Sequence, residues 1–228
     1  METPPSPPAA SGLVQRLARI RADIQATAHK AQREPGAVTL VAVSKTQPQE
    51  AVLALLEAGH NVFGENRVQE AQAKFSALRG HKLFTLHLIG PLQSNKVKAA
   101  LELFDVIETI DRPALVEALG KALKGASRRP RFLVQVNIGR EPQKAGVLPE
   151  GLPDLLGLCQ QHDIYIEGLM CIPPAGEDPV PYFTQLATLA RQHGLKELSM
   201  GMSSDFEQAI ACGATAVRVG SALFGARA

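Results

Sequence analysis

The chain has 228 residues and a formal net charge of +2, with 45% hydrophobic and 20% charged residues. This balance is typical of a globular protein with a sizeable core, and it gives no electrostatic support to a nucleic-acid partner. No apolar stretch approaches the roughly 20 residues that span a bilayer. We therefore expect neither a nucleic-acid-binding nor a membrane protein.

The cysteines indicate a reducing compartment. Cys159, Cys171 and Cys212 are widely separated and form no CxxC pair, and the histidines complete no four-ligand metal pattern around them. We interpret each as a small buried hydrophobic residue and expect no metal site. The N-terminal residues have neither a basic nor an apolar segment of a secretory signal, so the predicted location is cytoplasmic.

The N-terminal region divides into a tail and a helix. Residues 1–12 are rich in Pro, Ala and Ser, and they predict a disordered tail. Helical spacing begins at once after them, in the apolar residues Leu13, Leu17, Ile20 and Ile24. This pattern predicts an amphipathic helix from residue 13 to about residue 33, ahead of the first strand.

Short β-branched or apolar runs then alternate with segments of helical periodicity. The eight runs cover residues 39–45, 61–66, 84–90, 105–110, 131–139, 165–173, 197–203 and 216–221. Helical segments between them include residues 48–58, 68–78, 113–123 and 181–193. This alternation implies βαβ units and a parallel sheet.

Eight parallel strands are the number that closes a (β/α)8 barrel. The alternative is an open doubly wound sheet, which usually has a Gly-rich turn after its first strand. Here the first strand ends in Ser44, Lys45 and Thr46 instead. We predict one α/β domain over residues 13–228, a single (β/α)8 TIM barrel whose functional site lies at the carboxyl ends of the strands.

Lys45 ends the first predicted strand directly after four apolar residues and a serine. One interpretation is a solvated strand end. The other is a nucleophilic amine, which desolvation at the barrel mouth would favour in the neutral form that attacks an aldehyde.

Two further turns lie at the same predicted rim. Ser203 and Ser204 follow the seventh strand, and Gly220 and Ser221 follow the eighth. Loops at these places commonly bind phosphate in this fold, through free N–H groups and a helix N-terminus. The alternative is that the serines only cap helices.

The remaining polar candidates each have a structural alternative. Arg218 lies two residues before Gly220, on the same face of its strand, so it either forms an ion pair inside the barrel or contacts a bound heterocycle or anion. His87 and Met170 by themselves are typical of core residues. The segment with Asn137 and Lys144 by itself is typical of a solvated loop.

The order and combination of several short blocks carry a family resemblance. They are residues 42–45 (AVSK), 63–66 (FGEN), 68–70 (VQE), 87–90 (HLIG), 92–96 (LQSNK), 137–138 (NI), 168–170 (GLM), 200–205 (MGMSSD) and 217–221 (VRVGS), with Glu141, Lys144 and Gly146. In these blocks the chain resembles the YggS/PROSC family of pyridoxal-phosphate homeostasis proteins, over about residues 13–226. The resemblance implies a barrel similar to the N-terminal domain of alanine racemase.

The resemblance also implies a cofactor site. Pyridoxal 5'-phosphate is expected as an internal aldimine on Lys45, with Arg218 facing the pyridine nitrogen. The other residues that the resemblance assigns to the cofactor are Ser203, Gly220 and Ser221 at the phosphate, and Asn66, His87 and Met170 around the ring. Lys144 matches a family lysine whose role the resemblance leaves open.

Two functions remain, a carrier in intracellular vitamin B6 homeostasis and a pyridoxal-phosphate-dependent amino-acid racemase. Arg218 cannot accept a proton from the pyridine nitrogen, which disfavours electron-sink catalysis. Racemisation needs proton donors on both faces of a planar carbanion, and Lys45 alone is credible. The sequence ends at Ala228, so we expect no second domain. We predict a non-enzymatic carrier, monomeric rather than an obligate oligomer, whose protein partners would be apo-forms of pyridoxal-phosphate enzymes.

Overall fold

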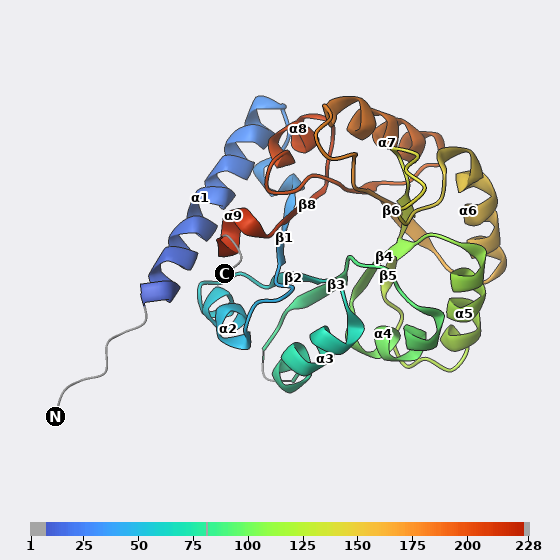
Figure 1. The fold of residues 1–228 in the computed structure, drawn as a ribbon, viewed down its shortest axis with the longest axis horizontal. Helices are drawn as coiled ribbons and strands as arrows, with labels where there is room; N and C mark the ends of the chain where they lie inside the picture. Colours follow the sequence, from blue (N-terminus) through green and yellow to red (C-terminus); the bar gives the residue numbers. More distant parts are fainter. Residues whose placement is uncertain (1–7, 81, 226–228) are drawn as a thin grey trace.

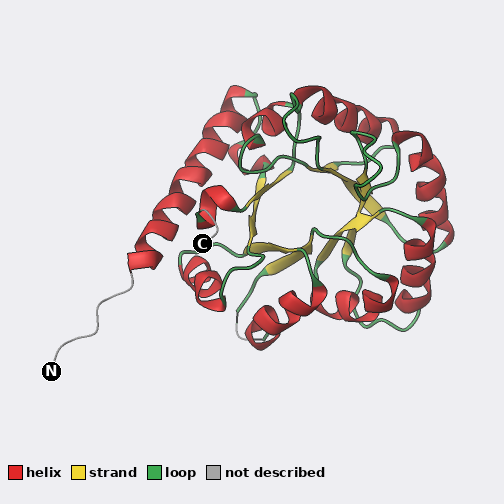
Figure 2. Ribbon diagram, viewed as in Figure 1, coloured by secondary structure: helices red, strands yellow, loops and turns green. Residues whose placement is uncertain are grey.

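The computed structural model of the chain describes residues 8–80 and 82–225. Its centre is a closed barrel in which each parallel strand pairs with the next and β8 pairs with β1 (Figure 2). The strands are β1 (Thr39–Val43), β2 (Val62–Glu65), β3 (Thr85–Leu88), β4 (Val106–Ile110), β5 (Arg131–Val136), β6 (Ile166–Cys171), β7 (Glu197–Ser199) and β8 (Ala216–Val219). The predicted barrel and its eight strands are confirmed. Most strands end one to four residues earlier than predicted.

Helices surround the barrel and bury their apolar faces against it (Figure 1). The α-helices are α1 (Pro8–Lys30), α2 (Gln49–Glu57), α3 (Val68–Phe75), α4 (Val97–Leu103), α5 (Pro113–Leu123), α6 (Leu152–Gln161), α7 (Val180–Gln192), α8 (Phe206–Ala211) and α9 (Ser221–Phe224). Short 3₁₀ helices are η1 (Pro35–Ala37), η2 (Ser76–Leu78), η3 (Ser94–Lys96) and η4 (Pro149–Gly151). In α5, for example, Leu115, Leu119 and Leu123 recur at helical spacing and are all buried.

The N-terminal helix starts earlier than predicted. Residues 8–12 were expected in the disordered tail but form the first turn of α1, and residues 1–7 lie outside the described residues. Pro8 has no backbone N–H to leave unsatisfied, and the two alanines after it have the highest helix propensity. The amphipathic stripe is confirmed, since Leu13, Leu17, Ile20 and Ile24 are all buried.

Helix α1 lies outside the join between β1 and β8, where it packs on α2, α8 and α9 (Figure 1). Arg16 Nε donates a hydrogen bond to the carbonyl oxygen of Leu223 in α9 at 2.6 Å. Arg33 Nη1 donates to the carbonyl oxygens of Ile210 and Ala214 at 3.0 and 2.7 Å. These bonds attach α1 and the segment after it to carbonyls at the end of α9, at the end of α8 and in the loop after α8.

Two cysteines are buried, as predicted, and the third is half-buried. Burial raises the pKa of Cys159 and of Cys171 to about 12, so both thiols stay neutral at ordinary pH. Cys212 is also free. Within residues 8–80 and 82–225, no helix is long and apolar enough to cross a membrane, and no cluster of three metal-binding side chains occurs.

Asp105, just before β4, joins three segments on the outside of the barrel. Its carboxylate accepts hydrogen bonds from Arg79 Nη2 at 2.7 Å, from the backbone N–H of Leu86 at 2.8 Å and from Arg128 Nη2 at 2.5 Å. Partial burial alone would raise the pKa of Asp105, but these hydrogen bonds and the Arg79 charge outweigh burial and lower it. The carboxylate is therefore stabilised in its ionised form.

We expect Asp105→Asn to lower the free energy of unfolding by about 2 kcal/mol at pH 7, because charge-assisted hydrogen bonds are lost. A carboxyl whose pKa is lowered by folding stabilises the fold above its ordinary value of about 3.9. The difference from wild type should therefore be constant near neutrality and shrink as the pH falls below that value. Urea unfolding at a series of pH values measures it.

Glu150→Gln is the matched control, because Glu150 is a fully exposed carboxylate paired with Arg140. Exposed pairs of this kind contribute little to stability, so no measurable change is expected. Equal destabilisation by both substitutions would contradict the role assigned to Asp105.

Candidate functional site

Strand register brings the predicted site residues to one rim. Val43 pairs with Gly64 of β2, and Ala42 pairs with Val219 of β8. Continuing the first register by two residues sets Lys45 level with Asn66, and continuing the second by one sets Val43 level with Gly220. Polar residues from the beginning and the end of the chain therefore meet at the carboxyl-terminal mouth.

A cavity of about 330 Å³ opens at this mouth, within the range of small-molecule sites. Six of the eight predicted site residues line it, namely Lys45, Asn66, Ser203, Arg218, Gly220 and Ser221. Sequence reasoning missed most of the rest of the lining, which is Val43, Thr46, Gln47, Ile89, Ile172, Met202, Ser204, Phe224 and Gly225. The apolar members among these provide a wall for a flat, partly apolar ligand.

His87 and Met170 do not line this cavity, contrary to expectation. Both are buried inside the barrel, and His87 instead borders a second, smaller cavity toward the amino-terminal end of the strands. The residues two positions further along the same strands, Ile89 and Ile172, are those that reach the mouth. Side chains on one face recur every second residue, so the predicted pair lies one layer too deep.

A buried ionic cluster holds the backbone on either side of Lys45. Lys74 Nζ of α3 donates hydrogen bonds to the carbonyl oxygen of Ser44 at 2.6 Å and to Glu65 Oε1 at 2.7 Å. Ser44 Oγ donates to the same Glu65 oxygen at 2.7 Å, and Glu70 accepts a bond from the backbone N–H of Thr46. Burial raises the pKa of Glu65, against the opposing effect of Lys74 and Ser44.

The residue after Lys45 has a strained backbone. Thr46 has φ of 62°, in the left-handed region that β-branched residues rarely adopt. The backbone N–H of Gln47 donates to the carbonyl oxygen of Ser44 at 3.0 Å, which closes a tight turn around Lys45. Such strain persists only where the surroundings impose it, and it is frequent at functional sites.

Ser203 faces the loop after β8 and does not cap α8. Its Oγ accepts hydrogen bonds from the backbone N–H groups of Gly220 at 3.3 Å and Ala222 at 3.2 Å. The residue at the N-cap position of α8 is Asp205, whose carboxylate accepts from the backbone N–H of Met202 at 2.6 Å. Two backbone donors thus converge on one oxygen at the mouth, as at an anion site.

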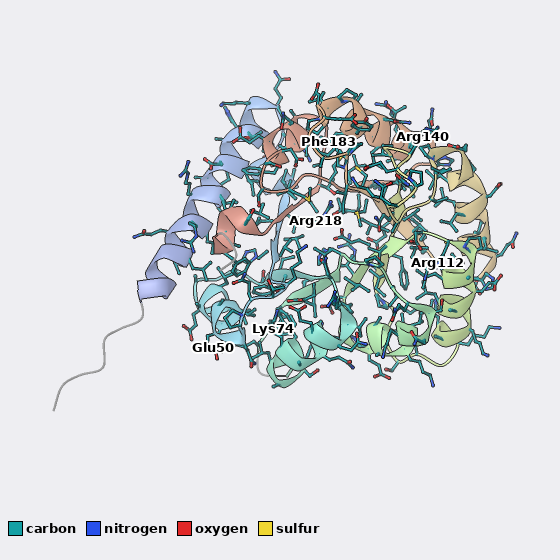
Figure 3. The ribbon with its side chains drawn as sticks, in the orientation of Figure 1. Glu50, Lys74, Arg112, Arg140, Phe183 and Arg218 are labelled. Carbon is teal, nitrogen blue, oxygen red and sulfur yellow. The ribbon has the colours of Figure 1, made fainter. Side chains whose placement is uncertain are left out.

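Arg218 of β8 lies within the ring of strands (Figure 3), where it is buried and lines the cavity. Its Nη1 donates to Ser199 Oγ at 2.7 Å and its Nη2 to the carbonyl oxygen of Cys171 at 2.8 Å. Ser199 Oγ in turn donates to Glu108 Oε2 at 2.5 Å, and Nη1 of Arg218 lies 4.0 Å from the same carboxylate oxygen. Arg218 is therefore paired inside the barrel and also faces the cavity.

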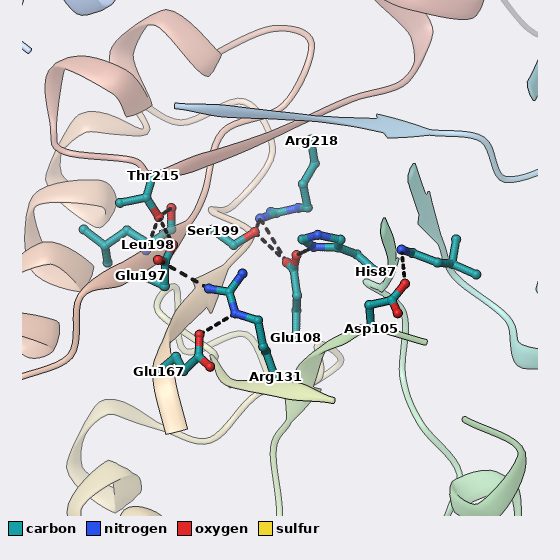
Figure 4. Close-up of polar contacts among 11 residues, drawn as sticks. His87, Asp105, Glu108, Arg131, Glu167, Glu197, Leu198, Ser199, Thr215 and Arg218 are labelled. Atoms are coloured by element: carbon teal, nitrogen blue, oxygen red, sulfur yellow. Dashed lines mark hydrogen bonds and ion pairs between the residues drawn. The ribbon is translucent and has the colours of Figure 1, made fainter. Parts of the chain in front are cut away.

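The hydrogen-bond network formed by Arg218, Ser199 and Glu108 ends at His87 (Figure 4). His87 Nδ1 lies 2.6 Å from Glu108 Oε1, so Glu108 bridges the histidine and the Ser199–Arg218 pair. Burial alone would raise the pKa of Glu108, but the hydrogen bonds from His87 and Ser199 and the charges of His87 and Arg218 outweigh burial and lower it. Sequence reasoning missed Glu108 and Ser199. A carboxylate within the β-branched run of β4, between Ile107 and Thr109, was the available signal, because a buried charge requires a partner.

The loop after β5 lies outside the cavity lining. Lys144 Nζ pairs with Glu141 Oε2 at 2.5 Å and donates to the carbonyl oxygen of Pro173 at 3.1 Å. Asn137 Nδ2 donates to the carbonyl oxygen of Glu141 at 2.8 Å. In the structure, Lys144 thus connects this loop to the segment after β6.

The donor set of the cavity fits a ligand with an aldehyde and an anionic group. Lys45 contributes an amine to the lining and Arg218 a guanidinium, and Ser203, whose Oγ accepts hydrogen bonds from the backbone N–H groups of Gly220 and Ala222, contributes a hydroxyl. Fold and site together define a barrel of the alanine racemase N-terminal class. The family model described as "Alanine racemase, N-terminal domain" matches residues 15–228.

Curated relatives narrow the class. The chain is 39% identical to a protein of Pasteurella multocida and 40% identical to one of Aquifex aeolicus, in both cases over 93% of this chain and 97% of the relative. Both are named pyridoxal phosphate homeostasis protein. The chain belongs to the pyridoxal phosphate homeostasis protein family.

Solved structures agree with this assignment. The structure of a Bifidobacterium adolescentis protein, described as an unknown protein, matches over 98% of this chain and 98% of its own, with a TM-score of 0.89 and 30% identity. PipY of Synechococcus elongatus, in a structure with PLP bound, covers 93% of this chain and 100% of its own, with a TM-score of 0.78 and 40% identity. An alanine racemase of Clostridium difficile, at 13% identity and a TM-score of 0.73, shows the shared fold.

We expect Lys74→Met to lower the free energy of unfolding by about 3 kcal/mol near neutral pH, because it leaves the buried Glu65 without its cation. Loss of Lys74 should raise the pKa of Glu65 further. A carboxyl with a raised pKa destabilises the fold only when it is ionised, so the loss should be larger at pH 8 than at pH 5. Urea unfolding at both pH values measures it.

Glu65→Gln combined with Lys74→Met should recover part of the loss, because no buried charge then remains in the pair. Lys121→Met on the exposed face of α5 is the control and should have little effect. A pH-independent loss, or no recovery in the double variant, would contradict the pairing.

Proposed function

We propose that the chain binds pyridoxal 5'-phosphate at the carboxyl-terminal mouth and holds it covalently on Lys45, as a carrier in intracellular vitamin B6 homeostasis. The observation that carries this proposal is that Lys45 and the donors around Ser203 line one cavity. The cofactor bound in PipY, a relative 40% identical, supports it. Formation of a Schiff base would join Lys45 Nζ to the aldehyde carbon and release the carbonyl oxygen as water.

Each group at the mouth has a place in this proposal. The backbone N–H groups of Gly220 and Ala222, with the hydroxyls of Ser203 and Ser221, would hold the phosphate. Arg218 would lie against the ring, where a permanent positive charge disfavours protonation of the pyridine nitrogen. Asn66, Ile89 and Ile172 would flank the ring and limit its movement.

The side chains that line the cavity favour a carrier function over racemase activity. Of the described residues that line it, Lys45 is the one side chain able to exchange a proton with a substrate near neutral pH, since Arg218 stays charged. The two tyrosines of the chain do not reach the mouth, because Tyr165 is exposed beside β6 and Tyr182 of α7 donates to Glu177 on the surface. Among the described lining residues, a second base for the opposite face of a substrate carbanion is therefore missing.

We expect purified protein mixed with pyridoxal 5'-phosphate to show a visible absorption band that Lys45→Ala abolishes, because the imine can no longer form. Borohydride reduction followed by peptide mass spectrometry should locate the cofactor on Lys45. Lys121→Ala, on the outer face of α5, is the matched control and should keep the band. An unchanged spectrum in Lys45→Ala, or cofactor fixed on another lysine, would overturn the assignment.

We also expect no interconversion of L- and D-alanine above the uncatalysed rate, because the cavity offers a proton donor on one side only. Chiral chromatography of overnight incubations measures it, with an authentic alanine racemase as the positive control. Turnover that Lys45→Ala abolishes would reverse the ranking and favour the racemase.

A further inference from the structure

Arg218 carries a buried positive charge, and its own strand offers no group of opposite charge. It is a permanently charged residue, 3% exposed, in the middle of a closed parallel barrel, with two of its nitrogens bonded to neutral groups. A buried charge is tolerated only when it is paired and hydrogen-bonded. The compensating charge comes from the far side of the barrel, on β4.

We propose that Glu108 is a positioning residue, which acts through Ser199 to hold the Arg218 guanidinium in the floor of the ligand cavity. This inference rests on the proposed function, because its consequence is the affinity for pyridoxal 5'-phosphate. Glu108 itself does not line the mouth cavity, so it reaches the ligand site only through other residues.

The geometry of the network supports a directional role. Ser199 accepts a hydrogen bond from Arg218 and donates its own proton to Glu108, so the hydroxyl is used in both directions. Reversal of that hydroxyl would place two donors against each other. The second guanidinium bond, to the carbonyl oxygen of Cys171, fixes the rotation of the group about its long axis. Bonds to β6 and β7 thus orient the cation, and the β4 carboxylate supplies the opposite charge.

Glu108 is suited to this task because it stays ionised. Its Oε1 accepts from His87 and its Oε2 from Ser199, so each carboxylate oxygen has a partner although the side chain is almost completely buried. In a low-dielectric interior each of these bonds is stronger than in water, and each broken one is correspondingly costly. The carboxylate should therefore restrict Arg218 to one arrangement before any ligand arrives, which lowers the entropic cost of binding.

The test compares Ser199→Ala, which removes the link, with Glu108→Gln, which keeps the shape and removes the charge. Equilibrium titration with pyridoxal 5'-phosphate, followed by absorbance, gives Kd for each variant. We expect each substitution to raise Kd about tenfold, or about 1.4 kcal/mol. The double variant should be little weaker than either single variant, because both act along one path.

The decisive comparison measures the effect of Glu108→Gln in a protein that already carries Arg218→Met. Once the guanidinium is gone, Glu108→Gln should leave Kd within twofold, and it should raise the melting temperature because the buried carboxylate has then lost its compensating cation. Asp105→Asn is the control for destabilisation alone, since Asp105 lies outside the barrel interior, and it should leave Kd unchanged. An unchanged Kd in Glu108→Gln, or an equal loss in the Arg218→Met background, would overturn the positioning role.

A crystal structure of ligand-free Ser199→Ala separates this inference from the proposed function. The Arg218 guanidinium should move from its place or occupy several, whereas an unmoved side chain would overturn the inference. Failure of the wild-type protein to bind pyridoxal 5'-phosphate would instead refute the proposed function, whatever the position of Arg218.

Discussion

The cost of keeping one positive charge inside a closed barrel shapes the centre of this molecule. Arg218 lies where water is largely excluded, and it requires both hydrogen-bond acceptors and an opposite charge. Those partners come from β4, β6 and β7, and with His87 of β3 and Arg218 of β8 five strands contribute to one network. A parallel barrel is a suitable scaffold, because its inward side chains form layers to which strands distant in sequence contribute. The ligand cavity lies directly above this layer and takes its cationic floor from it.

The buried ionic cluster formed by Lys74, Glu65 and Glu70 lies outside the strand ring and holds the backbone on the Lys45 side of the mouth. Lys74 of α3 bonds the backbone at Ser44, and Glu70 bonds the backbone at Thr46, so both neighbours of Lys45 are held by the same helix. The helix packed behind β2 therefore fixes the direction in which the strand-end lysine leaves the barrel. The loop after β8, whose backbone N–H groups bond Ser203, is supported in a similar way, since Arg16 of α1 bonds the short helix α9 that follows Gly220.

These contacts from the surrounding helices explain how strained backbone conformations persist at the mouth. The left-handed Thr46 and the left-handed Gly201 both lie in turns that connect a strand end to the following helix. Gly201 has no room for a side chain, because an added Cβ would lie 2.5 Å from that of Ala209. Turns of this kind keep the cavity residues close to rigid elements, which favours a pre-formed site over one assembled on binding.

The amino-acid sequence by itself determined the alternation of eight strands with helices, the closed barrel and the rim on which Lys45, Ser203 and Gly220 meet. It did so because periodicity and strand ends are local properties, and the barrel rule converts strand ends into one site. The depth of each inward residue was decided only by the tertiary structure. The side chains of His87 and Met170 face the barrel interior, as a site residue must, but they lie one layer below the mouth. Strand tilt and stagger place equivalent positions of different strands at different heights. The partnership of Arg218 with Glu108 was likewise beyond the sequence, because the two residues are separated by half the chain and meet only when the ring closes.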